Sequence, residues 1–197
     1  MLQALIIDFG GVLSTPFDDS ARRFSLEEGL EPTALRSAMV ANAALVADLE
    51  RGAITQAQFA ETIGDALRIF PDDLVERMCR GLELRREVMD AVARVRRRGV
   101  KVAVLSNSVG SDPFDLYERF DLDRKVDVLV ASDREKLRKP DPEIYRLTAG
   151  RLGIAPKDCV YADDSAKFLE PAAQLGMTTV HATDPAITIK ALADLFG

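Results

Sequence analysis

The feature that most constrains the fold is an alternation between short apolar runs and longer amphipathic segments. Each apolar run is too short for a helix, is rich in Val, Ile or Leu, and is bounded by Gly, Asp or Ser. The runs do not alternate apolar with polar residues, which indicates strands covered on both faces and hence a parallel sheet. The predicted strands are Leu2–Ile7, Val100–Leu105, Val126–Ala131, Cys159–Ala162 and Thr178–His181.

The segments between these runs carry the apolar spacing of amphipathic helices. Strand and helix therefore follow one another along much of the chain, which predicts an α/β fold with a doubly wound parallel sheet. The predicted helices of this part are Glu87–Arg98, Pro113–Phe120, Pro142–Leu152, Ala166–Leu175 and Ala186–Phe196.

One stretch, from about Pro16 to Leu84, has helical patterns and no strand candidate. Thr55, followed three residues later by Gln58, resembles a capping box at a helix start. The sequence Pro71-Asp72-Asp73 predicts a second helix start, with proline near its beginning and acids in its first turn.

These patterns predict two structural units. An α/β core consists of residues 1–15 and 85–197, and a small all-helical cap of residues 16–84 is inserted after the first strand. Because ligands of open α/β sheets bind beyond the carboxyl ends of the strands, the cap is expected to cover the binding site.

The net charge of the chain argues against some classes of binding partner. A net charge of −6 and a pI of about 5.0 argue against nucleic acid and anionic membranes as partners. The basic run at 94–99 ends a predicted helix, where cations offset the helix dipole. No apolar stretch approaches the ~20 residues of a membrane span.

Cysteine usage and the N-terminus indicate a cytoplasmic protein. Cys79 and Cys159 lie far apart in apolar surroundings, which favours buried thiols over a disulfide or a zinc site. The first apolar run is too short for a signal peptide, and no charged leader precedes it.

Polar side chains follow several of the predicted strands. Asp8 follows the first, Ser106-Asn107 the second, and Asp163-Asp164 the fourth, while Lys139 immediately precedes a predicted helix. A parallel sheet brings its carboxyl ends to one edge, so these groups are expected to converge. Carboxylates with a lysine and a hydroxyl form an oxygen-rich site that suits Mg²⁺ and phosphate oxygens.

Each of these groups also has an ordinary structural explanation when it is taken singly. Asp8 could shape a loop, Ser106-Asn107 could form a turn, and Asp163-Asp164 could cap a helix. Lys139 could be a surface lysine. Their occurrence together, in this order and at strand ends, is what favours a catalytic site.

The sequence resembles the haloacid dehalogenase superfamily in four successive motifs. They are "IIDFGGVLS", "VLSNS", "KPDPEIY" and "VYADDSAKFLEPAAQLGM", and the similarity is greatest to the branch with a helical cap after the first motif. The resemblance covers the whole chain and implies a Mg²⁺-dependent phosphatase that acts on a small phosphorylated metabolite.

The resemblance also implies a role for each motif residue. Asp8 would be the nucleophile that forms an aspartyl-phosphate, and Lys139 would assist it. Ser106, Asn107 and Lys139 would bind the phosphoryl oxygens. The metal ligands would be Asp8, the backbone carbonyl of Gly10 and Asp164, with Asp163 beside them. An anionic nucleophile can approach an anionic phosphate only where positive charge neutralises their mutual repulsion. A metal ion and Lys139 would supply that charge, which agrees with these roles.

Gly10 departs from the family pattern. Phosphatases of this family usually have a second Asp there, which acts as general acid and base. Glycine can still offer its carbonyl to the metal but cannot transfer a proton. Because a positioned acid or base contributes typically ~10²–10⁴-fold, its loss is expected to weaken catalysis without abolishing it.

Other functions stay open. A catalytically impaired relative could bind a phosphorylated ligand or a partner protein without turnover, and Gly10 favours this alternative. A metal-free haloacid dehalogenase would use the same nucleophile position, but such enzymes usually have an aromatic residue at the position of Gly10 and lack the acidic pair. The kinase-like sequence Asp8-Phe9-Gly10 is a chance match, because no glycine-rich loop or HRD loop accompanies it.

A few further residues have two possible roles. His181, the only histidine, stands at the end of the last predicted strand, as an edge residue or a catalytic base. Phe17, Arg22, Arg23 and Phe24 of the predicted cap could face substrate or could serve the helix surface and core.

Overall fold

The computed structural model describes residues 2–197, so Met1 of the predicted core unit lies outside the described residues. A five-stranded parallel sheet has the order β3-β2-β1-β4-β5. The predicted strands are confirmed, with ends that differ by at most two residues. Their bounds are β1 Ala4–Ile7, β2 Lys101–Ser106, β3 Val128–Ala131, β4 Cys159–Asp163 and β5 Thr178–His181.

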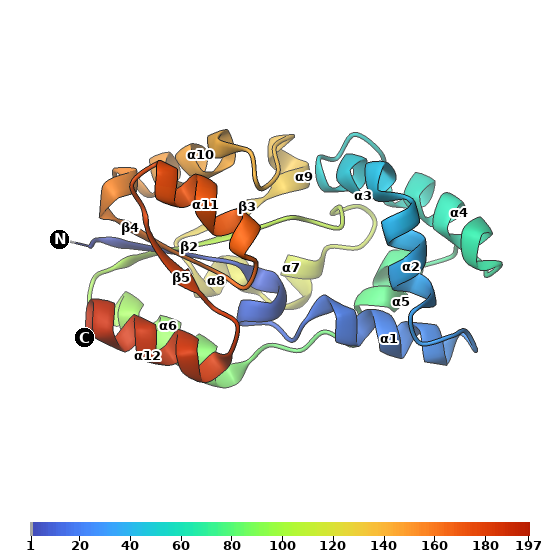
Figure 1. Cartoon of the computed structure of the whole chain (residues 1–197), viewed down its shortest axis with the longest axis horizontal. Coiled ribbons are helices and arrows are strands. Elements are labelled where there is room, and N and C mark those ends of the chain that lie inside the picture. The colour runs from blue at the N-terminus through green and yellow to red at the C-terminus, as the bar shows by residue number, and fades with distance from the viewer. Residues whose placement is uncertain (1) are drawn as a thin grey trace.

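Helices cover both faces of this sheet, which confirms the doubly wound fold (Figure 1). Alternate strand residues enter two separate apolar clusters: Leu5 and Ile7 lie in one, and Ala4 and Ile6 in the other. The helices α6 and α12 contact each other and contribute to the first cluster, while α10 contributes to the second. Their bounds are α6 Arg86–Arg97, α10 Pro142–Leu152, α11 Ala166–Gln174 and α12 Pro185–Phe196.

This part also contains three short α-helices and a 3₁₀ turn, namely α7 Leu116–Arg119, α8 Leu122–Lys125, α9 Ser132–Glu135 and η2 Pro156–Asp158. The helix predicted at Pro113–Phe120 is therefore shorter than expected. Asp115 caps it by accepting hydrogen bonds from the backbone N–H groups of Tyr117 and Glu118, so the residues before Asp115 lie outside the helix.

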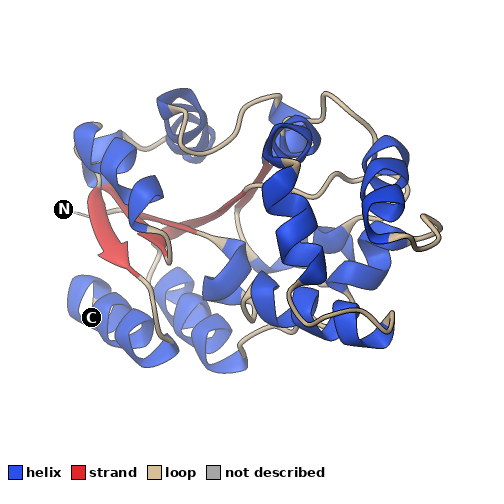
Figure 2. Ribbon diagram, turned by 45° about the vertical axis from the view of Figure 1, so that its right-hand side comes forward, coloured by secondary structure: helices blue, strands red, loops and turns tan. Residues whose placement is uncertain are grey.

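The described residues between 16 and 84 contain helices and no strand. After a wide turn at Phe9–Leu13 (η1), which the hydrogen bond from the Ser14 N–H to the Phe9 carbonyl closes, the chain forms five helices that lie beyond the strands, on the right of Figure 1. Figure 2, turned by 45°, shows the same helices beside the sheet. Their bounds are α1 Phe17–Glu27, α2 Ala34–Ala41, α3 Ala43–Glu50, α4 Gln56–Leu67 and α5 Leu74–Cys79.

The two predicted helix starts in this segment have different outcomes. The capping box of Thr55 and Gln58 is present at the start of α4, with both reciprocal hydrogen bonds. The prediction for Pro71-Asp72-Asp73 is wrong in detail, because α5 begins only at Leu74. Asp73 has the left-handed conformation (φ 50°) and the preceding residues form a turn, so these acids lie before the first helical turn.

Two connecting segments join the helical insertion to the sheet, and they pair with each other. The backbone N–H of Thr15 donates to the carbonyl of Glu83 at 2.9 Å, and that of Arg85 donates to the carbonyl of Leu13 at 2.9 Å. Ser14 and Leu84 form an antiparallel bridge between these bonds. The division into a core of residues 1–15 and 85–197 and a cap of residues 16–84 stays a prediction.

Cys79 and Cys159 are buried free thiols, as predicted. Burial raises the pKa of Cys79 to about 12 and that of Cys159 to about 11, so both thiols are expected to be unreactive at neutral pH. Within residues 2–197, no helix combines the length and the apolar character that a membrane span requires.

Candidate active site

The carboxyl ends of the central strands bring the predicted acidic residues together. Ile7 lies opposite Val104 of β2 and Ala162 of β4, so Asp8 emerges between the ends of these two strands. Its backbone N–H donates to the carbonyl of Ala162 at 2.9 Å. Carboxylate oxygens of Asp8, Asp163 and Asp164 lie within 4.8 Å of one another.

Lys139 is buried between two of these carboxylates. Its Nζ lies 2.7 Å from Asp8 Oδ1 and 2.7 Å from Asp163 Oδ2, and only 1% of its side chain is exposed. Nζ also lies 4.8 Å from the ring centroid of Phe168. Although burial disfavours the charged form, the two carboxylates outweigh it and raise the pKa of Lys139, so the ammonium stays charged.

Asp163 is fully buried, and its carboxylate accepts three hydrogen bonds. Oδ1 accepts from the backbone N–H of Ser165 at 2.8 Å, and Oδ2 accepts from Lys139 Nζ and from the hydroxyl of Tyr161. These donors occupy the oxygens that a metal would need. The geometry therefore suits a residue that holds Lys139 more than a direct metal ligand.

Asp164, in contrast, is exposed. Burial of part of its carboxyl and the neighbouring Asp163 raise its pKa above the usual value. Burial also raises the pKa of Asp8 to about 7, assisted by Asp163 and Asp164 and opposed by Lys139. Three carboxylates thus share one buried ammonium, and a further cation would relieve the excess of negative charge.

The donor set fits Mg²⁺. Asp8 and Asp164 offer hard carboxylate oxygens at one edge of the sheet, which is the chemistry that Mg²⁺ prefers. Gly11 leaves room for this arrangement, because a Cβ at that position would lie 2.3 Å from Asp164 Oδ2. Asp8 and Asp164 are therefore the residues that would hold the ion.

Gly10 and Gly11 differ in why they are glycines. Gly11 has φ 80°, the left-handed region that favours glycine, and its carbonyl accepts a hydrogen bond from Arg85 Nη1 at 2.8 Å. Gly10 has φ −72° and ψ 121°, which any residue can adopt, and a Cβ there would meet no atom within 4 Å. Neither backbone strain nor crowding therefore requires glycine at position 10.

Ser106 and Asn107, predicted to bind phosphate, lie at the end of β2. Ser106 is buried beside Asp8's strand, and Asn107 holds the loop that carries Lys139. The side-chain oxygen of Asn107 accepts from the backbone N–H of Lys139 at 2.8 Å, and its Nδ2 donates to the carbonyl of the same residue at 3.2 Å. Asn107 thus fixes the backbone from which the lysine extends.

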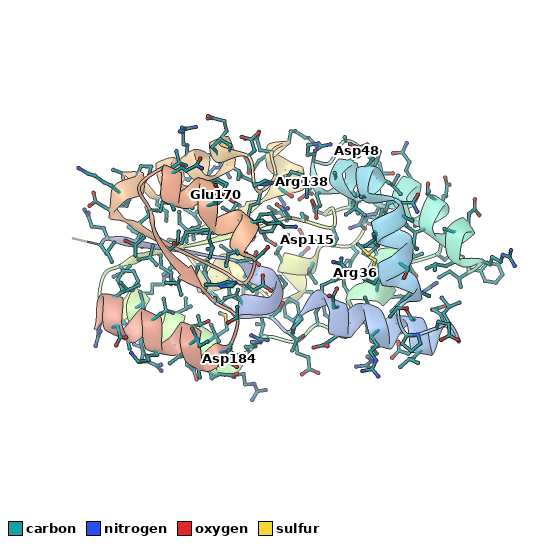
Figure 3. All side chains as sticks on the ribbon, in the orientation of Figure 1. Arg36, Asp48, Asp115, Arg138, Glu170 and Asp184 are labelled. Atoms are coloured by element: carbon teal, nitrogen blue, oxygen red, sulfur yellow. The ribbon has the colours of Figure 1, made fainter. Side chains whose placement is uncertain are left out.

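Glu50, the last residue of α3 in the helical insertion, was not among the residues predicted from the sequence. Its Oε2 lies 2.6 Å from Arg138 Nε and accepts from Asn107 Nδ2 at 3.3 Å. Burial raises the pKa of Glu50, with Arg138 and Lys139 opposing the shift. In Figure 3, the label of Arg138 lies between the helices that pack against the sheet and α3 of the insertion. Only the folded chain brings Glu50 to Asn107, so no local signal indicated it.

Tyr161 was also missed, but the sequence contained a signal for it. Residues two apart in a strand point to the same side, so Tyr161 and Asp163 of β4 share one side of the sheet. A tyrosine two positions before a buried acid could have been recognised as a hydrogen-bond donor.

The remaining candidates lie away from the acidic cluster or serve other contacts. His181 ends β5 and is exposed, with Nε2 lying 2.9 Å from the carbonyl of Asp164. Phe24 is buried in the apolar core, and Phe17 packs against that core. Arg22 is exposed, and Arg23 forms an exposed ion pair with Glu27.

Comparison with known proteins identifies related sequences and folds. The family model of haloacid dehalogenase-like hydrolases matches residues 2–176. A phosphorylated carbohydrates phosphatase from Thermotoga maritima is 32% identical over 94 residues, which are 48% of this chain and 44% of that protein. The (S)-2-haloacid dehalogenase 4A from Burkholderia cepacia is 30% identical over 94 residues, 48% of this chain and 41% of that protein. The chain thus matches less than half the length of these curated relatives.

Among solved structures, a variant of the HAD family enzyme bt-2542 from Bacteroides thetaiotaomicron, in complex with magnesium and inorganic phosphate, has a similar fold. The TM-score is 0.72 at 21% identity, and the match covers 91% of this chain and 93% of that chain. At this identity the likeness concerns the fold alone.

Proposed function

This chain belongs to the haloacid dehalogenase-like hydrolase family, and from that premise we propose that it is a Mg²⁺-dependent phosphatase of a small phosphorylated metabolite. The observation that carries the proposal is the position of Lys139, whose Nζ lies 2.7 Å from both Asp8 and Asp163. A buried ammonium beside a nucleophilic carboxylate can neutralise an approaching phosphate.

The proposed reaction has two displacement steps at phosphorus. In the first, an oxygen of Asp8 forms a bond to phosphorus, and the bond from phosphorus to the leaving oxygen breaks. In the second, water attacks the aspartyl-phosphate, and the bond from phosphorus to Asp8 breaks, which releases inorganic phosphate and restores the carboxylate. Bound Mg²⁺ would supply positive charge for the phosphoryl oxygens.

Each residue of the cluster has a proposed role in these steps. Lys139 binds the phosphoryl oxygens as negative charge leaves Asp8, and Asp163 holds the lysine in place. Ser106 donates to a phosphoryl oxygen, and Asn107 keeps the backbone of Lys139 fixed. Asp8, the backbone carbonyl of Gly10 and Asp164 are the proposed metal ligands.

The absence of an acidic side chain at Gly10 limits the proposed substrates to phosphates with good leaving groups. Because position 10 has no acidic side chain, the leaving oxygen departs with most of its negative charge and takes its proton from solvent. Phosphates with acidic leaving groups, such as acyl, aryl or anomeric sugar phosphates, are therefore the best proposed substrates. The Thermotoga maritima relative, named for phosphorylated carbohydrates, supports the sugar phosphates among these.

A phosphate-release screen of phosphorylated metabolites, with Mg²⁺ and with excess chelator, tests the proposal. We expect release that requires Mg²⁺. Activity that persists in chelator, together with halide release from 2-haloacids, would indicate the metal-free dehalogenase instead. Binding of a phosphorylated compound without any release would indicate the catalytically impaired relative.

A further inference from the structure

Tyr161 is connected to the site by a contact that the proposed roles above do not use. Its hydroxyl donates to Asp163 Oδ2, the same oxygen that accepts Lys139 Nζ at 2.7 Å. Tyr161 and Asp163 are both fully buried, so water does not replace this donor. Tyr161 therefore acts on Lys139 through Asp163.

The contact changes how two carboxylates share one ammonium. Lys139 Nζ lies at the same distance, 2.7 Å, from Asp8 and from Asp163. Hydrogen bonds that a carboxylate accepts from other donors stabilise its charge and reduce its attraction for a further cation. Tyr161 and the backbone N–H of Ser165 supply two such donors to Asp163.

We propose that Tyr161 is a positioning residue for phosphoryl transfer, because its hydroxyl weakens the hold of Asp163 on Lys139 and leaves the ammonium free to follow charge from Asp8. The inference rests on the proposed function. When Asp8 becomes an aspartyl-phosphate, its negative charge passes to the phosphoryl oxygens, and Lys139 must move with it. A carboxylate without the tyrosine donor would hold the lysine back.

Tyr145 provides a matched control. It is also a fully buried tyrosine, and its ring contacts that of Tyr161 edge-on at 5.2 Å between centroids. Its hydroxyl, however, donates to the backbone carbonyl of Phe168 at 2.9 Å and not to Asp163. Tyr161→Phe and Tyr145→Phe each remove one buried hydroxyl, and only the first removes a donor to the acidic cluster.

The first experiment compares kcat and KM of both variants with those of the wild type, on the best substrate from the phosphate-release screen. Tyr161→Phe is expected to lower kcat by about 5- to 30-fold, a factor that corresponds to about 1–2 kcal/mol, with KM changed less than about twofold. Tyr145→Phe should keep kcat within about twofold. Equal losses of kcat in both variants, or a lower melting temperature with unchanged kcat, would overturn the inference.

A double-mutant cycle tests whether the effect passes through Asp163. In an Asp163→Asn background, Tyr161→Phe is expected to change kcat by less than about twofold, because the carboxylate on which the hydroxyl acts is absent. A full effect in that background would show that Tyr161 acts by another route and would overturn the inference.

A binding experiment separates this inference from the proposed function. Beryllofluoride with Mg²⁺ mimics a phosphoryl group on a carboxylate and needs no turnover, and calorimetry measures its affinity. We expect Tyr161→Phe to weaken beryllofluoride binding by about 5- to 30-fold and Tyr145→Phe to leave it unchanged. If the wild type binds but hydrolyses nothing, the proposed function fails while this result still decides the inference. If it neither binds nor hydrolyses, both fail.

Discussion

Asp163 and Asp164 are adjacent in the sequence, yet they belong to two different regions of the site. On the closed side, defined by Lys139, Asp163 and Tyr161, every group is buried and engaged by other side chains. On the open side, defined by Gly10 and Asp164, the carboxylate is exposed, and a Cβ at position 10 would meet no atom within 4 Å. We propose that the closed side holds a charge in place and that the open side is where metal and substrate would bind.

Asp8 lies between the two sides, and its substitution is expected to have the largest effect on activity. Asp8→Asn keeps the shape of the side chain but provides a far poorer nucleophile and metal ligand. We expect loss of phosphatase activity in a folded protein, measured by phosphate release and circular dichroism. Turnover that persists in a pure Asp8→Asn preparation would contradict the covalent mechanism.

The adjacent acids offer the next test. Asp164→Ala is expected to impair Mg²⁺-dependent turnover more than Asp163→Ala, because Asp164 is the proposed direct ligand. Asp163→Ala is expected to lower the free energy of unfolding by about 1–3 kcal/mol, because the buried donors of Tyr161 and Ser165 lose their acceptor while Lys139 keeps Asp8 as a partner.

Magnesium titrations and urea unfolding of both variants measure these two effects. Asp163→Asn serves as a milder control because it keeps the volume of the side chain. Loss of stability in Asp164→Ala equal to that in Asp163→Ala would remove the distinction between the open and closed sides.

Gly10→Asp is expected to add a carboxyl group on the open side that can donate a proton to the leaving oxygen. The backbone conformation suits any residue, and a Cβ at position 10 would meet no atom within 4 Å. Activity toward phosphates of simple alcohols should rise by up to ~10²-fold if the new carboxyl reaches the leaving oxygen. It would rise less if the rotamer is wrong, because small misplacements are costly in catalysis.

The measurement is the slope of log rate against leaving-group pKa, with the wild type as control. A steep slope is expected for the wild type and a shallower one for Gly10→Asp. A flat slope in the wild type, with chemistry shown to be rate-limiting, would mean that another residue supplies the proton.

The smallest expected effects separate the two glycines. Gly11→Ala places a methyl group 2.3 Å from Asp164 Oδ2 at φ 80°, and we expect it to lower the free energy of unfolding by about 1–3 kcal/mol. Gly10→Ala should instead raise it by about 0.4–1 kcal/mol, through reduced freedom of the unfolded chain. Thermal unfolding of both variants measures the difference, and equal destabilisation would show that position 10 is also constrained.

Much of the fold could be predicted because its signals are local. The five strands were located to within two residues, since short apolar runs between turn residues are read directly from the sequence. The errors lie at helix starts, because a single residue can determine where a helix begins. Asp115 caps α7, which therefore begins later than the pattern indicated, and the left-handed conformation of Asp73 places the start of α5 at Leu74.

The sequence by itself determined the parallel sheet, the helical insertion and the set of residues that could converge at the carboxyl edge, because periodicity and strand ends are properties of short segments. Only the tertiary structure decided which of these residues touch. Lys139 meets Asp8 across 131 positions of sequence, and Glu50 meets Asn107 across 57. Burial follows from packing as well: of two adjacent aspartates, Asp163 turns toward the buried lysine and Asp164 toward solvent. No local sequence pattern predicts this difference in burial, because it depends on contacts with segments that are distant in the sequence.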